Sequence, residues 1–304
     1  MSLPSVRWAG NGSGNEVSRM IATVQQVIRG VFQRKAAAAA KRLARFEKGG
    51  RIPWSTGYND YKWRGIQAAL AHPDFMGLVG SPGFGYRIDE RIVELPWLLS
   101  RLPAGPGVLL DAGSALNHGP VLDHPRLAEK RVFISTLAPE RKAYWERGIS
   151  YVYEDLRQTC FREACFDLIA CVSTLEHVGL DNTFLYTDDS DKKESDGSSY
   201  LDLIEVFRTR LKPGGRLFLT LPYGRRIVRG WFQVFDGPML DAIVARFAPT
   251  EARETMFMYR DDRWCLSNRE EARDATCFDV HVDPTPPPDY CAFSRAVVCL
   301  ELKR

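Results

Sequence analysis

Hydrophobic positions recur with a helical period in the first part of the chain. Between about Glu16 and Lys48 the apolar residues are spaced three and four apart, which places side chains on one stripe of an α-helix. Ala36 to Ala40 continue the segment with high helix propensity, and Gly49, Gly50 and Pro53 end it. We therefore predict one long helix over residues 16–48, preceded by a loose arm over residues 1–15. The stripe consists of Ile21, Val24, Val27, Ile28, Val31 and Phe32.

From Gly107 onward, short apolar runs alternate with helical patterns. Short buried strands separated by helices are typical of a parallel sheet that is covered on both faces. We predict an α/β fold with a doubly wound, Rossmann-like and mostly parallel seven-stranded sheet, whose last strand is antiparallel. The strands are expected at 108–110, 132–135, 150–153, 167–172, 216–221, 255–259 and 293–300, and helices at 89–101, 200–211 and 239–247.

From the helical period of the first part and the alternating strands and helices of the second, we predict two domains. Residues 1–104 form a basic helical extension with a lid or connector, and residues 105–304 form the Rossmann domain. The glycine cluster from Gly80 to Gly85 follows no predicted strand, so it indicates a turn and not a phosphate loop.

Composition narrows the class of protein. Hydrophobic residues make up 45% of the 304 residues, charged residues 26%, and the net charge is +3, so no nucleic-acid partner is indicated. The seven cysteines contain no CxxC pair, which argues against a zinc ribbon and for reduced thiols in the cytoplasm. No apolar run reaches about 18 residues and no signal-peptide pattern is present, so we expect no transmembrane segment.

The predicted N-terminal helix is strongly basic. Two interpretations stay open: peripheral contact with an anionic membrane surface or acidic polymer, or a solvated face of a helix whose stripe packs on the main domain. Between residues 16 and 51 the acids are Glu16 and Glu47, and the bases are Arg19, Arg29, Arg34, Lys35, Lys41, Arg42, Arg45, Lys48 and Arg51.

The first strand of the alternating region ends in a loop suited to a nucleotide-like ligand. It runs into Asp111 and Gly113 before the next helical pattern. Ligands of open parallel sheets bind where the carboxyl ends of the strands meet and the strand order reverses. Small residues in such a loop let the backbone approach the ligand closely.

This loop resembles the first motif of class I, Rossmann-type S-adenosylmethionine-dependent methyltransferases, of the methyltransferase type 11-like kind. In that family an acidic residue is followed by three alternating glycines. Asp111 matches the acid and Gly113 the first glycine, whereas Ala115 and Asn117 stand in place of the other two. The sequence therefore departs from the family pattern at two of the three glycine positions.

Four further segments resemble family motifs in the expected order: 132–140, 154–156, 166–178 and 211–222. The last two are the most specific, including Leu175, Glu176, His177 and Val178 at the end of the fourth strand. Thr136 stands where the family usually has an acid that holds the ribose hydroxyls. The resemblance covers about residues 105–225.

The resemblance implies S-adenosyl-L-methionine as cofactor, with no metal. Asp155 matches the acid that accepts from the adenine amino group, although Asp is also a common helix N-cap. The acidic run with Asp188, Asp189 and Asp191 admits a divalent cation or a solvated loop. The implied cofactor-binding residues are Asp111, Gly113, Ala115, Asn117, Thr136, Asp155, Leu156 and Ser173.

For catalysis, His177 is the candidate general base, with Glu176 second and His118 as a further lining residue. The alternative is that the imidazole of His177 packs beside the cofactor and transfers no proton. Tyr223 and Trp231 follow the fifth strand, where they could stack on a sugar or aromatic acceptor, with residues 231–236 forming part of the wall.

The resemblance to this family implies O-methylation of a small molecule or glycan, and the cysteines indicate the cytoplasm. A non-catalytic, methyltransferase-like binding or scaffold protein is the alternative, supported by Ala115, Asn117 and Thr136. An NAD-dependent enzyme is disfavoured, because it would need an intact GxGxxG loop and an acid closing the second strand.

Overall fold

The computed structural model describes residues 13–304, and within its first helix the side chains from residue 18 on, except those of residues 24, 25, 27, 28, 31 and 32. The chain divides into two compact units, residues 1–51 with 55–61 and residues 52–54 with 62–304. Most of the predicted arm, residues 1–12, lies outside the described residues. So do the stripe side chains of Val24, Val27, Ile28, Val31 and Phe32.

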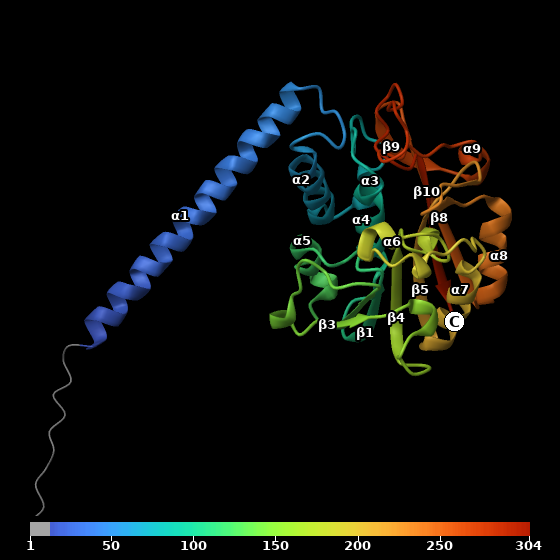
Figure 1. Ribbon diagram of the computed structural model, residues 1–304, viewed down its shortest axis with the longest axis horizontal. Helices are drawn as coiled ribbons and strands as arrows, with labels where there is room; N and C mark the ends of the chain where they lie inside the picture. The colour runs from blue at the N-terminus through green and yellow to red at the C-terminus, as the bar shows by residue number, and fades with distance from the viewer. Residues whose placement is uncertain (1–12) are drawn as a thin grey trace, which may run out of the picture. The chain divides into compact units, whose positions relative to one another are not determined.

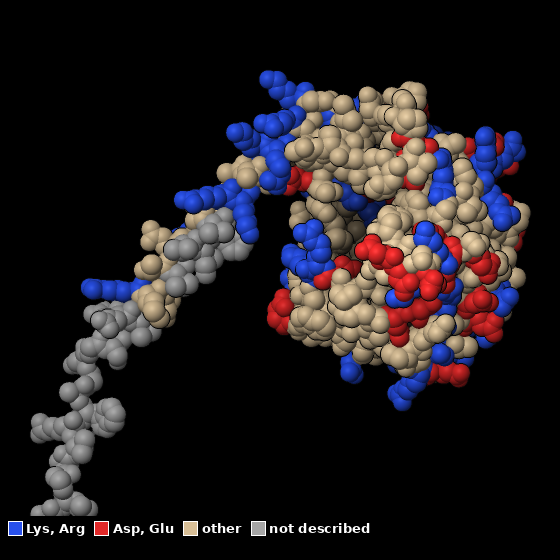
Figure 2. Space-filling model, viewed as in Figure 1, with Lys and Arg blue, Asp and Glu red and all other residues tan. Residues whose placement is uncertain are grey.

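The first unit contains the helix α1 (Ser13–Lys48). It ends as predicted, because Gly50 takes a left-handed φ of 87° that other residues rarely adopt. Near this end Phe46 packs on Tyr58 and Tyr61 at ring distances of 6.1 and 5.2 Å, and Arg42 pairs with Asp60 at 2.8 Å. Lysine and arginine side chains follow the described part of α1 in Figure 2.

The second unit is built on one eight-stranded sheet with the order β3-β2-β1-β4-β5-β10-β8-β9 (Figure 1). Strands β1 to β5 are parallel, and β10 is antiparallel to both β5 and β8. The predicted doubly wound, mostly parallel Rossmann-like sheet is confirmed. The strands are β1 (Gly107–Ala112), β2 (Lys130–Thr136), β3 (Ser150–Tyr153), β4 (Phe166–Val172), β5 (Leu211–Pro222), β8 (Glu251–Arg260), β9 (Arg263–Ser267) and β10 (Ala296–Lys303).

The sheet has one strand more than the seven predicted. β9 forms a hairpin with β8 through Asp261 and Asp262, whose φ angles are 50° and 58°. Two consecutive left-handed residues give the hairpin turn that matches strand twist, and glycine is its usual marker. The missing glycine is the reason that the sequence pattern did not reveal this strand.

Helices cover both faces of the sheet, and successive side chains of β5 point to opposite faces and pack against them. Leu217, Leu219 and Leu221 join the core with α7 (Tyr200–Arg210) and α8 (Gly237–Phe247). Phe218 points the other way and meets Trp97 of α4 (Arg91–Arg101) at a ring distance of 6.1 Å. A period of two along one strand therefore builds two apolar layers.

Connections between the first four strands are shorter than the predicted helices. They carry single turns: α5 (Gly119–Leu122), η1 (Pro125–Leu127), η2 (Trp145–Arg147) and η3 (Leu156–Gln158). The predicted connector over residues 54–86 contains two helices, α2 (Tyr58–Ala71) and α3 (Phe75–Leu78). The first turn of α2 belongs to the first unit. Gly85 packs so closely on Trp264 that a Cβ would lie 2.6 Å from its ring, in keeping with a turn.

The remaining short elements are η4 (Leu175–His177), α6 (Thr183–Tyr186), η5 (Ser190–Lys192), β6 (Ile227–Val228), β7 (Gln233–Val234) and α9 (Arg269–Ala272). Within residues 13–304, no helix has the length and apolar character needed to cross a membrane.

Candidate cofactor cleft

A cavity of about 870 Å³ opens at the carboxyl ends of β1 to β4. Its lining includes Gly113 after β1, Thr136 at the end of β2, Asp155 after β3, and Ser173 and His177 after β4. Strand β1 lies between β2 and β4, so the strand order reverses here. Sheets of this kind bind ligands at such a point. Five residues that the sequence singled out therefore meet around one cavity.

The turn after β1 is held by packing as well as by backbone geometry. Gly113 has a φ of 102°, and a Cβ on it would lie 2.0 Å from the Oγ1 of Thr174. Ser114 follows with a φ of 68°. Glycine is therefore required at 113 because the loop after β4 presses against this turn, a contact that the sequence alone did not indicate.

Asp111 lies beneath this turn with an exposed fraction of 0%. Its Oδ2 accepts from the backbone N–H of Leu116 at 2.9 Å, whereas Oδ1 has no partner among the described residues. Burial raises the pKa of Asp111 to about 7. The buried hydroxyl of Ser114 is likewise unpartnered in this part of the chain. Neither residue lines the cavity, so these two orphaned atoms lie beneath the turn that carries Gly113 and not in the cleft itself.

Ala115 and Asn117 support the turn from behind. The side chain of Asn117 donates to the carbonyl of Lys142 at 2.9 Å and accepts from the hydroxyl of Tyr151 at 2.8 Å. The backbone of Ala115 also acts to lower the pKa of Asp111, against the larger raising effect of burial. Neither residue is among those that line the cavity. Asn117 thus ties the loop to the segment after β2.

The carboxylate of Asp155 both caps a short helix and forms an ion pair. It caps η3 by accepting from the backbone N–H of Arg157 at 2.9 Å, and it pairs with the Arg157 guanidinium at 2.6 Å. Burial opposes its ionisation, but the hydrogen bonds and charge of Arg157 outweigh burial and lower the pKa of Asp155. Asp155 and the mostly buried Leu156 both line the cavity, so Asp155 borders the cavity while it caps the helix.

The neighbouring Glu154 also lines the cavity, with its carboxylate hydrogen-bonded to the ends of the strands. It accepts from the hydroxyls of Ser135 and Thr159 at 3.1 and 2.6 Å and from the backbone N–H of Cys160 at 2.8 Å. These bonds fix the ends of β2 and β3 relative to each other. Thr136 lines the cavity beside them.

The acidic insert over residues 181–196 forms one wall. Glu194 pairs with Arg157, and Tyr186 and Lys193 face the cavity. Asp189 accepts from the backbone N–H of Asp191 at 3.1 Å. No group of three or more His, Cys, Asp or Glu side chains is placed to hold a metal ion within the described chain. Acidic side chains gather over the region of α6 and α7 in Figure 2.

His177 is half-buried and lines the cavity, with one ring nitrogen engaged. Its Nδ1 lies 2.9 Å from the carbonyl oxygen of Trp231, so Nδ1 carries the proton and Nε2 is the acceptor. Burial lowers the pKa of His177 to about 4, against the raising effect of that hydrogen bond. The ring stacks on Trp231 at 5.0 Å with an interplanar angle of 22°. The imidazole is therefore neutral and can accept a proton.

Glu176 points into the interior instead. Its exposed fraction is 2%, its Oε2 has no partner among the described residues, and burial raises its pKa well above the usual range. It does not line the cavity. His118 is also outside the lining; its ring packs at a tilt against Trp63 at 4.3 Å, and burial and nearby cations lower its pKa to about 4.

Glu94 of α4 is a site residue that the sequence analysis missed. It is fully buried and accepts from the hydroxyls of Ser173 and Thr220 at 2.6 and 2.7 Å, while pairing with Arg91. Ser173 has a left-handed φ of 39° and lines the cavity. Glu94 therefore holds a strained residue at the cleft. Only the contact of α4 with β4 and β5 reveals it, because 79 positions separate Glu94 from Ser173.

The predicted acceptor wall is only partly formed. Tyr223 is 4% exposed and donates from its hydroxyl to the carbonyl of Arg269 at 3.3 Å, so it lies in the core. Phe232, Val234 and Phe235 are buried as well. Among the aromatic residues of this wall, Trp231 keeps an accessible face, whereas Phe232 and Phe235 turn inward with the antiparallel pair β6–β7.

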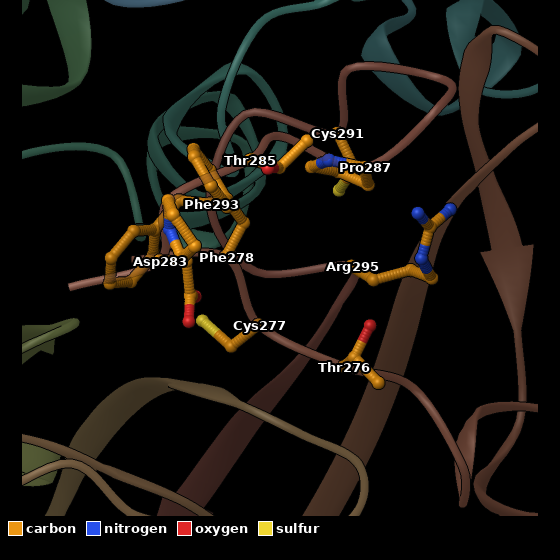
Figure 3. A pocket seen from close by; sticks show the side chains of 10 residues that line it. Thr276, Cys277, Phe278, Asp283, Thr285, Pro287, Cys291, Phe293 and Arg295 are labelled. Carbon is orange, nitrogen blue, oxygen red and sulfur yellow. The ribbon is translucent and has the colours of Figure 1, made fainter. Parts of the chain in front are cut away.

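A second cavity of about 250 Å³ lies within residues 276–295 (Figure 3). Cys277 and Cys291 reach it from different sides, and burial raises the pKa of both thiols, to about 12 for Cys291. Arg295 pairs with Asp289 at 2.6 Å. Neutral thiols and a paired cation give this cavity no reactive group.

No family profile and no curated protein matches this chain. Among solved structures, it is similar to the 1,6-didemethyltoxoflavin-N1-methyltransferase of Burkholderia thailandensis with bound S-adenosylhomocysteine, at 13% identity over 90% of this chain and 89% of that one, with a TM-score of 0.42.

It is also similar to the N-methyltransferase NodS of Bradyrhizobium japonicum, at 16% identity over 80% and 98% of the two chains, with a TM-score of 0.43. Likenesses at these scores do not decide function, so the function is inferred from the cleft itself.

Proposed function

We propose that the protein is an S-adenosylmethionine-dependent methyltransferase. The carrying observation is the single cavity at the strand-order reversal, bounded by Gly113, Thr136, Asp155 and His177. These residues come from four motifs that the sequence brings in family order. The carboxyl group of Asp111 beneath the Gly113 turn supports the fit, since its negative charge would attract the ammonium group of the cofactor's amino-acid part through the turn.

Each residue around the cavity has a proposed role in binding or in proton transfer. The cofactor supplies a methyl group on a positively charged sulfur. Asp155 accepts from the adenine amino group, Thr136 faces the ribose, and the Gly113 turn above Asp111 receives the amino-acid end. His177 holds its proton on Nδ1 and takes the acceptor's proton at Nε2. Ser173, held by Glu94, shapes the floor between them.

We further propose O-methylation of a small molecule or glycan in the cytoplasm. An hydroxyl acceptor must lose a proton, and the neutral imidazole of His177 supports such a role. Seven free cysteines support a reducing compartment.

A non-catalytic binding or scaffold protein is the second candidate. It is favoured by Thr136, whose hydroxyl is a weaker partner for a ribose diol than a carboxylate would be. Asn117 adds to it, because its side chain is engaged by Lys142 and Tyr151.

Calorimetric titration separates these functions. We expect S-adenosylhomocysteine to bind with one site per chain, and NAD⁺ not to bind. Binding of S-adenosylhomocysteine without methyl transfer to any hydroxyl acceptor would favour the scaffold. No binding of S-adenosylhomocysteine at millimolar concentration would end the methyltransferase proposal.

Peripheral contact of α1 with an anionic membrane is a separate proposal. Arg34, Lys35, Lys41, Arg45 and Lys48 are all exposed. Co-sedimentation with vesicles containing phosphatidylserine should exceed that with phosphatidylcholine alone and disappear when residues 1–48 are removed. Equal sedimentation with both vesicle types would contradict it.

A further inference from the structure

Several large apolar side chains are exposed beside the mouth of the cleft. Phe184 and Leu185 of α6 have exposed fractions of 58% and 62%. Phe184 meets Trp231 at 5.6 Å and His281 at 6.5 Å, and Trp231 lies 6.1 Å from His281. We call these four residues the apolar rim. A contiguous exposed apolar surface is unusual on a monomeric protein and marks a binding site.

The apolar rim is continuous with the cleft. Leu185 lines the cavity together with His177. The imidazole of His177 stacks on Trp231 and donates to its carbonyl, so one residue of the rim holds the candidate base. The rim therefore begins where the acceptor atom must lie for His177 to take its proton.

Hydrogen bonds hold the two halves of the rim together. The backbone N–H of Asp181 donates to the carbonyl of Gly230 at 3.1 Å, which joins the insert to the β6–β7 hairpin. The side chain of Asn182 donates to the carbonyls of His177 and Leu180 at 2.8 and 2.9 Å. The short helix α6 is thereby fixed beside the candidate base.

The polar atom of Trp231, its indole N–H, points into the protein. The indole Nε1 of Trp231 donates to Asp279 at 2.8 Å, and Asp279 is fully buried and also accepts from the backbone N–H of His281 at 2.9 Å. Arg229 pairs with Asp283 at 2.8 Å. With the indole N–H satisfied from below, Trp231 offers its ring and not a hydrogen-bond donor to a ligand.

We propose that the apolar rim binds the body of the acceptor, so that the substrate class is a small molecule with an aromatic ring or hydrocarbon chain beside its accepting hydroxyl. This rests on the proposed methyltransferase function. A glycan would need polar partners for its hydroxyls, and the rim presents hydrocarbon and ring surface. A protein partner is less well suited, because the rim leads into the same cavity of about 870 Å³ that holds His177.

A binding experiment tests the rim without a known acceptor. The probe is N-phenyl-1-naphthylamine, a neutral compound that fluoresces in apolar surroundings, titrated into the protein saturated with S-adenosylhomocysteine. The double variant Phe184→Ser/Leu185→Ser should bind the probe about tenfold or more weakly than the wild type. The matched control is Leu266→Ser on β9, since Leu266 is 49% exposed and lies outside the rim. Equal probe binding by all three proteins would overturn the proposal.

A transfer experiment tests the substrate class. We expect methylation of 2-naphthol but not of methyl glucoside, and a KM for 2-naphthol about tenfold higher in the double variant with kcat little changed. Preferred methylation of methyl glucoside would overturn the proposal. So would a wild-type dimer, seen by sedimentation, that the double variant abolishes and that excludes the probe.

The two levels of inference fail differently. If the wild type does not bind S-adenosylhomocysteine, the methyltransferase function is wrong, and the substrate assignment falls with it. The probe titrated into the protein alone then still reports on the rim. If S-adenosylhomocysteine binds equally to all three proteins but the probe does not distinguish them, the function stands and the rim assignment is wrong.

Discussion

At the scale of single residues, His177 combines a neutral imidazole with a fixed proton on Nδ1. If Nε2 accepts the proton of the acceptor, His177→Ala should lower turnover by roughly 10²- to 10⁴-fold with little effect on cofactor affinity. Because the free imidazole must be neutral to act, and its pKa is about 4, activity should persist at pH 5 and fall only as the pH approaches 4. Steady-state rates with 2-naphthol over pH 3.5–8 measure both effects.

A matched variant separates proton transfer from packing. His177→Gln can still donate to the Trp231 carbonyl but cannot serve as a base near neutral pH. Loss of turnover in both variants supports the base. Normal turnover at saturation, together with weakened S-adenosylhomocysteine binding, would show that the ring only packs beside the cofactor.

Asp155 is expected to contribute to cofactor binding beyond its capping role. Asp155→Asn removes the charge but keeps an oxygen that can cap the backbone of Arg157. The dissociation constant for S-adenosylhomocysteine should rise about ten- to a hundredfold, corresponding to roughly 1.5–3 kcal/mol for a lost charge-assisted hydrogen bond. Glu194→Gln is the control, because it removes the other carboxylate partner of Arg157. An unchanged constant for Asp155→Asn would leave Asp155 a cap only.

Asp111 makes cofactor binding depend on pH. Its pKa is raised to about 7 by burial, so about half of the free protein carries this proton at pH 7. A cationic group bound over the Gly113 turn favours the ionised form of Asp111 beneath it, and binding of S-adenosylmethionine should release up to about half a proton. Calorimetry at pH 7 in buffers of different ionisation enthalpy measures the release. It should vanish in Asp111→Asn; equal proton release by that variant would exclude Asp111 as its source.

At the scale of elements, one helix is joined to two strands through a carboxylate. Glu94 of α4 is the shared acceptor for Ser173 after β4 and Thr220 of β5, and it is also the partner of Arg91. Glu94→Leu would leave the arginine without its buried partner, which typically costs about 3–5 kcal/mol. We expect the free energy of unfolding in urea to fall by that amount.

The control for this prediction is another glutamate–arginine pair, at the protein surface. Glu205→Leu removes the partner of Arg246, where both side chains are exposed, and should change stability by less than about 1 kcal/mol. Similar stability of the Glu94 and Glu205 variants would mean that the buried network does not stabilise the fold.

At the scale of the whole molecule, the eight-stranded sheet and all cavity-lining residues belong to the second compact unit. Removing residues 1–48 should therefore leave a protein that unfolds in one cooperative transition and binds S-adenosylhomocysteine within about threefold of the full chain. Calorimetric unfolding and titration of residues 49–304 check this. Insoluble protein would show that the first helix belongs to the core, since truncation removes Phe46 from Tyr58 and Tyr61.

The sequence by itself determined the parts of the protein that depend on near neighbours. Periods of two and of three to four fixed the parallel strands, the helices α1, α4, α7 and α8 and the order of the motifs, because each signal lies within a few residues. The loop ending in Asp111 and Gly113 was found for the same reason.

Only the tertiary structure decided which polar groups meet. It turned Tyr223 into the core, engaged Asn117 with Lys142 and Tyr151, and placed Glu94 under Ser173. It also added β9 through a turn without glycine and brought Phe184, Trp231 and His281 together from three segments. These contacts join residues far apart in the chain, and burial and packing across the sheet select them, so no local pattern carries them.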